Sequence, residues 1–93
     1  MFKNLEQLVV TIRERKNSSL DQSYTNKLLN DKKLSVSKVK EEIQELIESV
    51  EQNSNKTHEA ADVIYHLMVY LEANNIKIED VLNELKKRQN ELR

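Results

Sequence analysis

The sequence VSKVKEEIQELIESVEQ, residues 36–52, decides the fold of this chain. Its apolar residues recur at the 3.6-residue spacing of an α-helix and form the clearest amphipathic stripe in the sequence: Val36, Val39, Ile43, Leu46, Ile47 and Val50. Ser35 or Ser37 is expected to cap the start of this helix. Because a helix with one apolar stripe must bury that stripe against other elements, the stretch predicts a helical bundle.

The segments on either side also have helical periodicity. Residues 4–16 predict a first helix, and residues 23–30 predict a short second helix after a break over residues 17–22. A fourth helix, capped by Asn55 or Thr57, is expected to run to residue 73, where Asn74 and Asn75 suit a left-handed stop. A last helix over residues 78–92 is expected to bury Ile78, Val81, Leu82 and Leu85. We therefore predict one all-α domain over residues 1–93, a bundle of four to five helices.

Composition limits the chemistry and the partners. The chain has 93 residues and contains no Gly, Pro or Cys, which excludes disulfides and thiolate metal sites and disfavours tight hairpins and glycine-rich phosphate loops. Fifteen basic residues against sixteen acidic ones give no reason to expect a nucleic-acid surface. No run approaches the length of a membrane span, and residues 1–8 do not resemble a secretion signal, so a cytoplasmic protein without membrane contacts is expected. A domain of this size buries only about 60–65% of its surface, which favours a homodimer or a higher homo-oligomer.

Four glutamates lie within two turns of the helix predicted over residues 36–52, at Glu41, Glu42, Glu45 and Glu48. Glu42 and Glu45 flank its apolar stripe. Taken alone, a pair of glutamates three residues apart is more often a solvated acidic face than a binding site. The sequence of the next predicted helix favours a binding site over a solvated face.

From Ala60 to Leu71 every residue except Asp62 and His66 is apolar or tyrosine, so this segment should be buried on most faces. Its main core stripe is predicted to be Ala60, Ile64, Leu67 and Leu71, with Glu59, Asp62 and His66 sharing the opposite side. A buried carboxylate costs several kcal/mol without a compensating cation. In an antiparallel pair of helices these acids would face Glu42 and Glu45, which predicts a divalent cation between them.

Oxygen ligands without cysteine favour Mg²⁺, with Mn²⁺ as a possible substitute. Such a site can neutralise phosphates and orient water, which points to a hydrolase that cleaves a nucleotide's phosphate chain. His66 and Tyr24 are candidate substrate contacts, and Tyr65 is expected to pack. Candidate phosphate contacts, each of which is more often a solvated surface cation, are Lys27, Lys38, Arg88, Arg13 and Arg15.

The two acidic pairs, EEIQE at residues 41–45 and EAAD at residues 59–62, resemble the ExxE…ExxD signature of MazG-type all-α nucleotide pyrophosphohydrolases. Within that superfamily, the chain resembles the phosphoribosyl-ATP pyrophosphatase family. The shared landmarks are SYTNKLL at residues 23–29, KVKEE at 38–42, EAADVIYHLMVYL at 59–71 and IEDVLNELKKR at 78–88.

The resemblance implies magnesium-dependent hydrolysis of phosphoribosyl-ATP to phosphoribosyl-AMP and pyrophosphate, the second step of histidine biosynthesis. It also implies an intertwined dimer with metal sites near the subunit interface. The implied metal ligands and catalytic acids are Glu42, Glu45, Glu59 and Asp62, with Glu41 as a catalytic helper.

Two departures and two alternatives accompany the resemblance. Lys40 stands where the family usually has glycine, and residues 30–37 replace a glycine-bearing segment, so the loop before the third helix is expected to differ. One alternative is a MazG-type house-cleaning pyrophosphatase acting on nucleoside or deoxynucleoside triphosphates, which the SYT element and the Tyr65-His66 pair disfavour. The other is a non-enzymatic helical dimerisation module whose acids are solvated.

Overall fold

A computed structural model describes residues 1–17 and 23–91 of the chain, and this part is all-helical, with five α-helices and no strand. The helices are α1 (Lys3–Arg15), α2 (Tyr24–Asn30), α3 (Lys32–Gln52), α4 (Lys56–Ala73) and α5 (Ile78–Glu91). The predicted all-α fold is confirmed. Leu92 and most of the predicted break over residues 17–22 lie outside the described residues.

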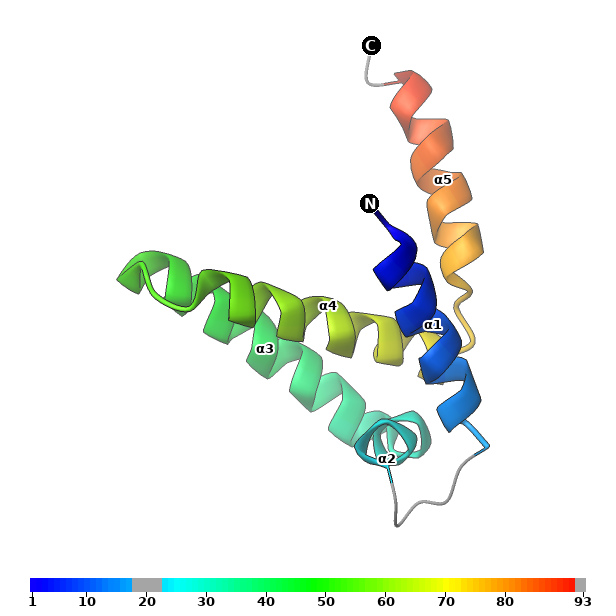
Figure 1. The fold of residues 1–93 in the computed structure, drawn as a ribbon, viewed down its shortest axis with the longest axis horizontal. Coiled ribbons are helices and arrows are strands. Elements are labelled where there is room, and N and C mark those ends of the chain that lie inside the picture. Colours follow the sequence, from blue (N-terminus) through cyan, green and yellow to red (C-terminus); the bar gives the residue numbers. More distant parts are fainter. Residues whose placement is uncertain (18–22, 92–93) are drawn as a thin grey trace.

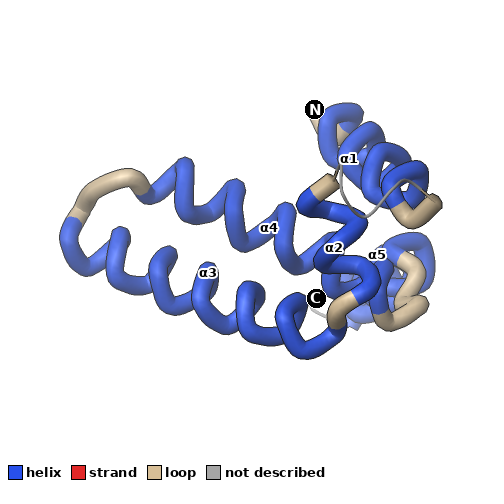
Figure 2. Tube along the Cα trace, turned by 90° about the horizontal axis from the view of Figure 1, so that it is seen from below, coloured by secondary structure: helices blue, strands red, loops and turns tan. Residues whose placement is uncertain are grey.

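The long helices α3 and α4 form an antiparallel pair, which is the main body of the fold (Figure 1). Seen from below, the other three helices gather at the end of this pair that is remote from the α3–α4 turn (Figure 2). Asn53 and Asn55 lie in the turn, with φ angles of 53° and 55°. Asn75, with φ of 58°, follows the C-terminal end of α4. Asparagine tolerates this left-handed region better than most residues, so it replaces glycine in a chain that has none.

The start of α3 differs from the prediction. Ser35 and Ser37 do not cap it, because the helix begins three residues before Ser35 and its cap is Asp31, whose side chain accepts a hydrogen bond from the amide of Leu34 at 3.0 Å. Asp is as good a cap as Ser, and residues 32–34 continue readily into a helix. Ser35 is instead buried inside α3. The loop between α2 and α3 is therefore reduced to a single residue, Asp31.

The core lies where α1, α2 and α4 meet, toward the C-terminal end of α4. Its buried apolar side chains are Ile12, Leu28, Leu29, Val69 and Ala73, with Leu8, Leu34, Tyr65 and Met68 packed against them. Asn26 is also buried and donates from its side-chain amide to the carbonyls of Arg15 and Lys16. This amide satisfies carbonyl groups at the end of α1 that the helix leaves unpaired, so it joins α2 to α1.

The predicted core stripe of α3 is only partly covered in a single chain, where Val36, Val39 and Leu46 are half-buried. Ile43, Ile47 and Val50 are exposed, and Ile47 retains 47% of its accessible surface. The buried residues of α3 are Ser35, Glu42 and Ser49, which recur every seven residues on the face toward α4. Small and acidic side chains therefore occupy the most enclosed positions of α3, while Ile43, Ile47 and Val50 of the apolar stripe face outward.

Two related expectations need the same correction. The predicted core stripe of α4, Ala60, Ile64, Leu67 and Leu71, is wrong at Ile64 and Leu67, which are exposed; the fully buried residues of this helix are His66, Val69 and Ala73, on the side that was predicted to lie opposite. Leu82 and Leu85 of α5 are exposed as well, and α5 has no fully buried residue, since this helix contacts only the end of α4 and side chains of α1. None of the described helices is long and apolar enough to cross a membrane.

Candidate active site

Acids from α3 and α4 meet in the half of the helix pair nearer the α3–α4 turn. Carboxylate oxygens of Glu42, Glu45 and Glu59 all lie within 4.8 Å of one another. Glu42 and Glu45 are three residues apart on α3 and so share a face, while Glu59 reaches them from the first turn of α4. The antiparallel pairing thus brings together carboxylates from two separate segments of the chain. The sequence predicts that these acids face each other.

Glu42 is the most enclosed of these acids, with 6% of its surface accessible. Its Oε2 atom is buried without a hydrogen-bond partner, and so is Oε2 of Glu59. Lys38, one turn earlier, lies 3.8 Å from the other oxygen of Glu42 and hydrogen-bonds to Glu41 at 2.9 Å. One lysine therefore leaves two buried carboxylate oxygens without compensation, which is unfavourable unless a cation or a proton is present.

The electrostatics of the group agree with its geometry. Burial raises the pKa of Glu42, and the neighbouring Glu45 raises it further. Burial and then Glu45 also raise the pKa of Glu59. Carboxylates that crowd each other in a partly dry site resist ionisation and tend to keep their protons. A divalent cation can replace these protons, so such a site favours its binding.

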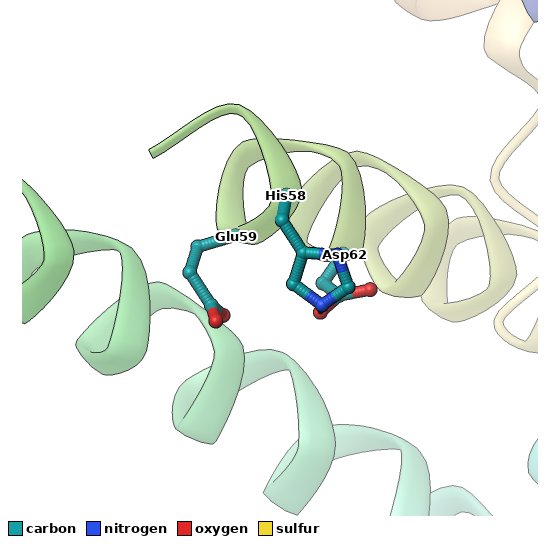
Figure 3. A group of neighbouring side chains, drawn as sticks. All are labelled: His58, Glu59 and Asp62. Atoms are coloured by element: carbon teal, nitrogen blue, oxygen red, sulfur yellow. Dashed lines mark ion pairs between the residues drawn. The ribbon is translucent and has the colours of Figure 1, made fainter. Parts of the chain in front are cut away.

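Asp62 lies one turn after Glu59 but is less enclosed than expected, with 36% of its side chain accessible. Its carboxylate lies 3.4 Å from Nε2 of His58, and ligand atoms of His58, Glu59 and Asp62 lie within 4.8 Å of one another (Figure 3). The sequence interpretation did not include His58. The i, i+4 spacing of His58 and Asp62 was the available signal, since it places both on one helix face.

Tyr24 and His66 lie beside the acids from the α2 side. The Tyr24 hydroxyl is 3.1 Å from Nε2 of His66, and Nδ1 of His66 is 2.8 Å from the backbone carbonyl of Asp62. Burial raises the pKa of Tyr24, so its hydroxyl remains a donor at neutral pH. Tyr65 packs against the core, as expected, and its hydroxyl hydrogen-bonds to Thr25.

Three of the predicted cations, Arg88, Arg13 and Lys27, make other contacts or lie exposed on other helices. Arg88 pairs with Glu84 on α5, which lies beyond the opposite end of α4 (Figure 1). Arg13 binds Glu72 and Glu79 and joins α1 to α4 and α5. Lys27 is exposed on α2. Within the described chain, Lys38 is the predicted phosphate contact that lies against the acids.

The donor set fits a hard divalent cation. The group offers carboxylate oxygens, two of them buried and unpartnered, and the chain supplies no thiolate. Mg²⁺ and Mn²⁺ bind through a few carboxylates together with waters and substrate oxygens. Glu42, Glu45, Glu59 and Asp62 are therefore the residues that could hold such an ion.

An all-helical chain with an ExxE pair on one long helix facing an ExxD pair on the next has the architecture of the MazG-like superfamily. A family model described as phosphoribosyl-ATP pyrophosphohydrolase matches residues 5–89. The chain belongs to this family of hydrolases.

Similar proteins agree with this assignment. The chain is 41% identical over 90 residues to a phosphoribosyl-ATP pyrophosphatase of Bacillus cereus, in a match that covers 91% of this chain and 82% of that protein. It is 36% identical over 91 residues to the phosphoribosyl-ATP pyrophosphatase of a Caulobacter species, covering 96% and 85%. It is also 46% identical over 69 residues to the histidine biosynthesis bifunctional protein hisIE, chloroplastic, of Arabidopsis thaliana, covering 71% of this chain but only 25% of that protein.

Proposed function

We propose that this chain hydrolyses phosphoribosyl-ATP to phosphoribosyl-AMP and pyrophosphate with Mg²⁺, the second step of histidine biosynthesis, in the cytoplasm. Membership of the phosphoribosyl-ATP pyrophosphohydrolase family supports the substrate. The observation that carries the reaction class is the buried Glu42 carboxylate, which has an unpartnered oxygen and lies within 4.8 Å of carboxylate oxygens of Glu45 and Glu59 from two helices. In a dimerisation module with solvated acids, these carboxylate oxygens would be exposed to water.

The residues of the site have different proposed roles in metal and substrate binding. Glu42, Glu45, Glu59 and Asp62 would hold one or two divalent cations, which when bound would neutralise phosphate charge and make the phosphorus more electrophilic. Lys38 keeps its charge, since its hydrogen bond to Glu41 raises its pKa, and it lies where it can contact a phosphate oxygen. Glu41 positions that lysine. Tyr24 and His66 contact the substrate beside the acids.

Two more substrate contacts are proposed from the family resemblance and from charge. Lys27 is exposed and can reach an incoming phosphate. Arg88 lies remote from the acids within one chain and would act on the site of a second copy. The assignment of Arg88 therefore depends on the oligomer.

A homodimer is also proposed, and the exposed stripe of the helix pair supports it. Ile43, Ile47 and Val50 of α3 and Ile64 and Leu67 of α4 are apolar side chains exposed on the central helix pair. Their burial against a second copy would remove this surface from water and enclose the site, at about 25 cal/mol for each Å² of apolar surface buried. The proposed partner is a second copy of this chain, because the apolar surface of one helix pair can pack against the identical surface of another.

The test is direct product analysis by phosphorus NMR. The protein is incubated with phosphoribosyl-ATP in the presence of Mg²⁺ or of excess chelator, and pyrophosphate and phosphoribosyl-AMP are observed without a coupling enzyme that itself needs Mg²⁺. Pyrophosphate formation only with Mg²⁺ is expected. A parallel panel of nucleoside and deoxynucleoside triphosphates checks the substrate, and higher kcat/KM for the panel would replace the proposed substrate with a house-cleaning one.

A further inference from the structure

His58 occupies the solvent-facing edge of the acidic site. It is the third residue of α4, with 73% of its side chain accessible, and Asp62 lies one turn later on the same face. Figure 3 shows its ring against the Asp62 carboxylate, while the Glu59 carboxylate extends toward α3. One nitrogen and two carboxylate oxygens thus lie within 4.8 Å of one another, from residues of a single helix end.

An exposed His–Asp pair on a helix surface is common and contributes little by itself. Glu59 distinguishes this one, because it belongs both to the group with His58 and Asp62 and to the group with Glu42 and Glu45. Oε2 of Glu59 is buried without a partner. Glu42, more than nine-tenths buried, presents a second unpartnered oxygen in the adjoining group. Glu59, the residue that the two groups share, therefore carries one of the two unpartnered buried oxygens, and Glu42 beside it carries the other.

We propose that His58 is a metal ligand: its imidazole binds, together with Glu59 and Asp62, a divalent cation at the outer edge of the site. This inference rests on the metal centre of the proposed function and adds a ligand that the four-acid signature lacks. Two ligands of one ion are at most about 4.2 Å apart when each bond is about 2.1 Å, so small side-chain rotations close the observed group around an ion.

The consequence is a change of metal preference. Imidazole nitrogen binds Mn²⁺, Co²⁺ and Zn²⁺ well, whereas Mg²⁺ takes its ligands from oxygen. The group of Glu42, Glu45 and Glu59 offers oxygen alone and suits Mg²⁺. The group containing His58 has mixed nitrogen and oxygen ligands, so this position binds Mn²⁺ more tightly than Mg²⁺.

The composition of the chain makes the ligand identifiable. The chain has two histidines, His58 and His66. Both ring nitrogens of His66 are engaged, one with the Asp62 carbonyl and one with the Tyr24 hydroxyl. An imidazole nitrogen that binds a metal while these two contacts of His66 are kept therefore comes from His58.

The experiment is pulsed EPR of Mn²⁺ bound to the full chain carrying no added histidines, without substrate. Electron spin-echo modulation from a directly bound ¹⁴N is expected in the unaltered protein and in Thr57→Gln, an exposed neighbour used as the matched control. His58→Gln should lose the modulation and bind Mn²⁺ at least about tenfold more weakly, given that loss of even an outer partner costs about 10–100-fold. Its Mg²⁺ affinity, measured by competition, should change little.

Several outcomes overturn the inference. Bound Mn²⁺ without nitrogen modulation, modulation that persists in His58→Gln, or no Mn²⁺ binding at all would each do so. Hydrolysis of phosphoribosyl-ATP is measured separately on the same preparations. Hydrolysis without nitrogen modulation removes the His58 ligand and leaves the proposed function, while modulation without hydrolysis removes the proposed function and leaves the ligand.

Discussion

The hydroxyl of Tyr24 donates a hydrogen bond to Nε2 of His66 across 3.1 Å, and this contact ties α2 to α4 beside the acids. The direction follows from the other ring nitrogen. Nδ1 of His66 lies 2.8 Å from the backbone carbonyl of Asp62, which can only accept, so Nδ1 carries the proton. In the neutral ring Nε2 is then an acceptor, and Tyr24 must be the donor. The rings meet edge to face, with centroids 6.0 Å apart.

Tyr24→Phe should remove this donor and leave Nε2 unpaired. Because Tyr24 is half-exposed, the loss in unfolding free energy is expected at the lower end of about 0.5–1.5 kcal/mol. Nitrogen NMR of the His66 ring should show the Nδ1-protonated tautomer in both proteins, because the Asp62 carbonyl still accepts from Nδ1, with the Nε2 resonance shifted in the variant, which has lost its donor. Tyr70→Phe, which removes a hydroxyl from α4 outside this pair, is the matched control. A predominant Nε2-protonated ring in the unaltered protein would contradict the assignment.

Glu42→Gln should abolish metal-dependent behaviour without harming the metal-free fold. The amide fills the same space and removes a buried charge whose pKa burial raises, so the metal-free melting temperature should stay equal or rise. The stabilisation by Mg²⁺ should disappear, and kcat/KM should fall about 100-fold or more. Thermal unfolding with and without Mg²⁺ and product analysis give both readouts. Glu51→Gln, exposed on the same helix, should retain both properties.

Metal should reverse the pH dependence of stability. The pKa values of Glu42 and Glu59 are raised in the folded protein, so the metal-free fold loses stability as pH rises from the ordinary glutamate value of 4.5 through the raised values. Bound metal requires ionised ligands, so with saturating Mg²⁺ stability should rise over the same interval. Melting temperatures from pH 5 to pH 8, with chelator or with Mg²⁺, measure both slopes. Equal slopes in the two series would refute the metal site.

Attachment of α5 should depend on the ion pair between Arg13 and Glu79. Two guanidinium nitrogens of Arg13 lie 3.0 and 2.6 Å from the Glu79 carboxylate, and this pairing lowers the pKa of Glu79 to about 2. The stabilisation is therefore complete above the ordinary glutamate pKa and is lost only as pH falls through about 2. At neutral pH, Glu79→Gln should speed amide hydrogen exchange in α5. Glu84→Gln, whose carboxylate contacts Arg88 within the same helix, should change exchange much less.

How far the sequence predicts this molecule depends on which interactions are local. Helix existence follows from periodicity and caps, and even the three left-handed positions among the described residues fall on asparagine in a chain without glycine. The start of α3 was missed because Asp31 competes locally with Ser35, and either side chain can cap. The pairing of Glu42 with Glu59 was predictable from antiparallel packing. The i, i+4 spacing of His58 and Asp62 is the same in a metal-binding pair as in an ordinary surface ion pair, so the sequence alone did not single out His58.

The outward stripe of α3 shows a different limit. Hydrophobic periodicity identifies a face that must leave water, but it does not say whether this chain or another covers it. Here Ser35, Glu42 and Ser49 form the face toward α4, since small side chains let the helices approach and the acid meets its partners. The exposed apolar residues Ile43, Ile47 and Val50 are thereby available for the proposed contact with a second copy.

Ile47→Glu tests that contact. Ile47 is exposed in the single chain, so the substitution should leave the helical circular dichroism of the protomer unchanged, while a charge placed in an apolar dimer interface should dissociate it. Light scattering after size-exclusion chromatography should give a dimer for the unaltered chain and a monomer of 11.0 kDa for the variant. Val10→Glu introduces the same charge at an equally exposed apolar residue of α1, away from the α3–α4 stripe, and should remain dimeric. A monomer in the unaltered protein at micromolar concentration, or equal dissociation by both substitutions, would show that the outward stripe of α3 and α4 is not the dimer interface.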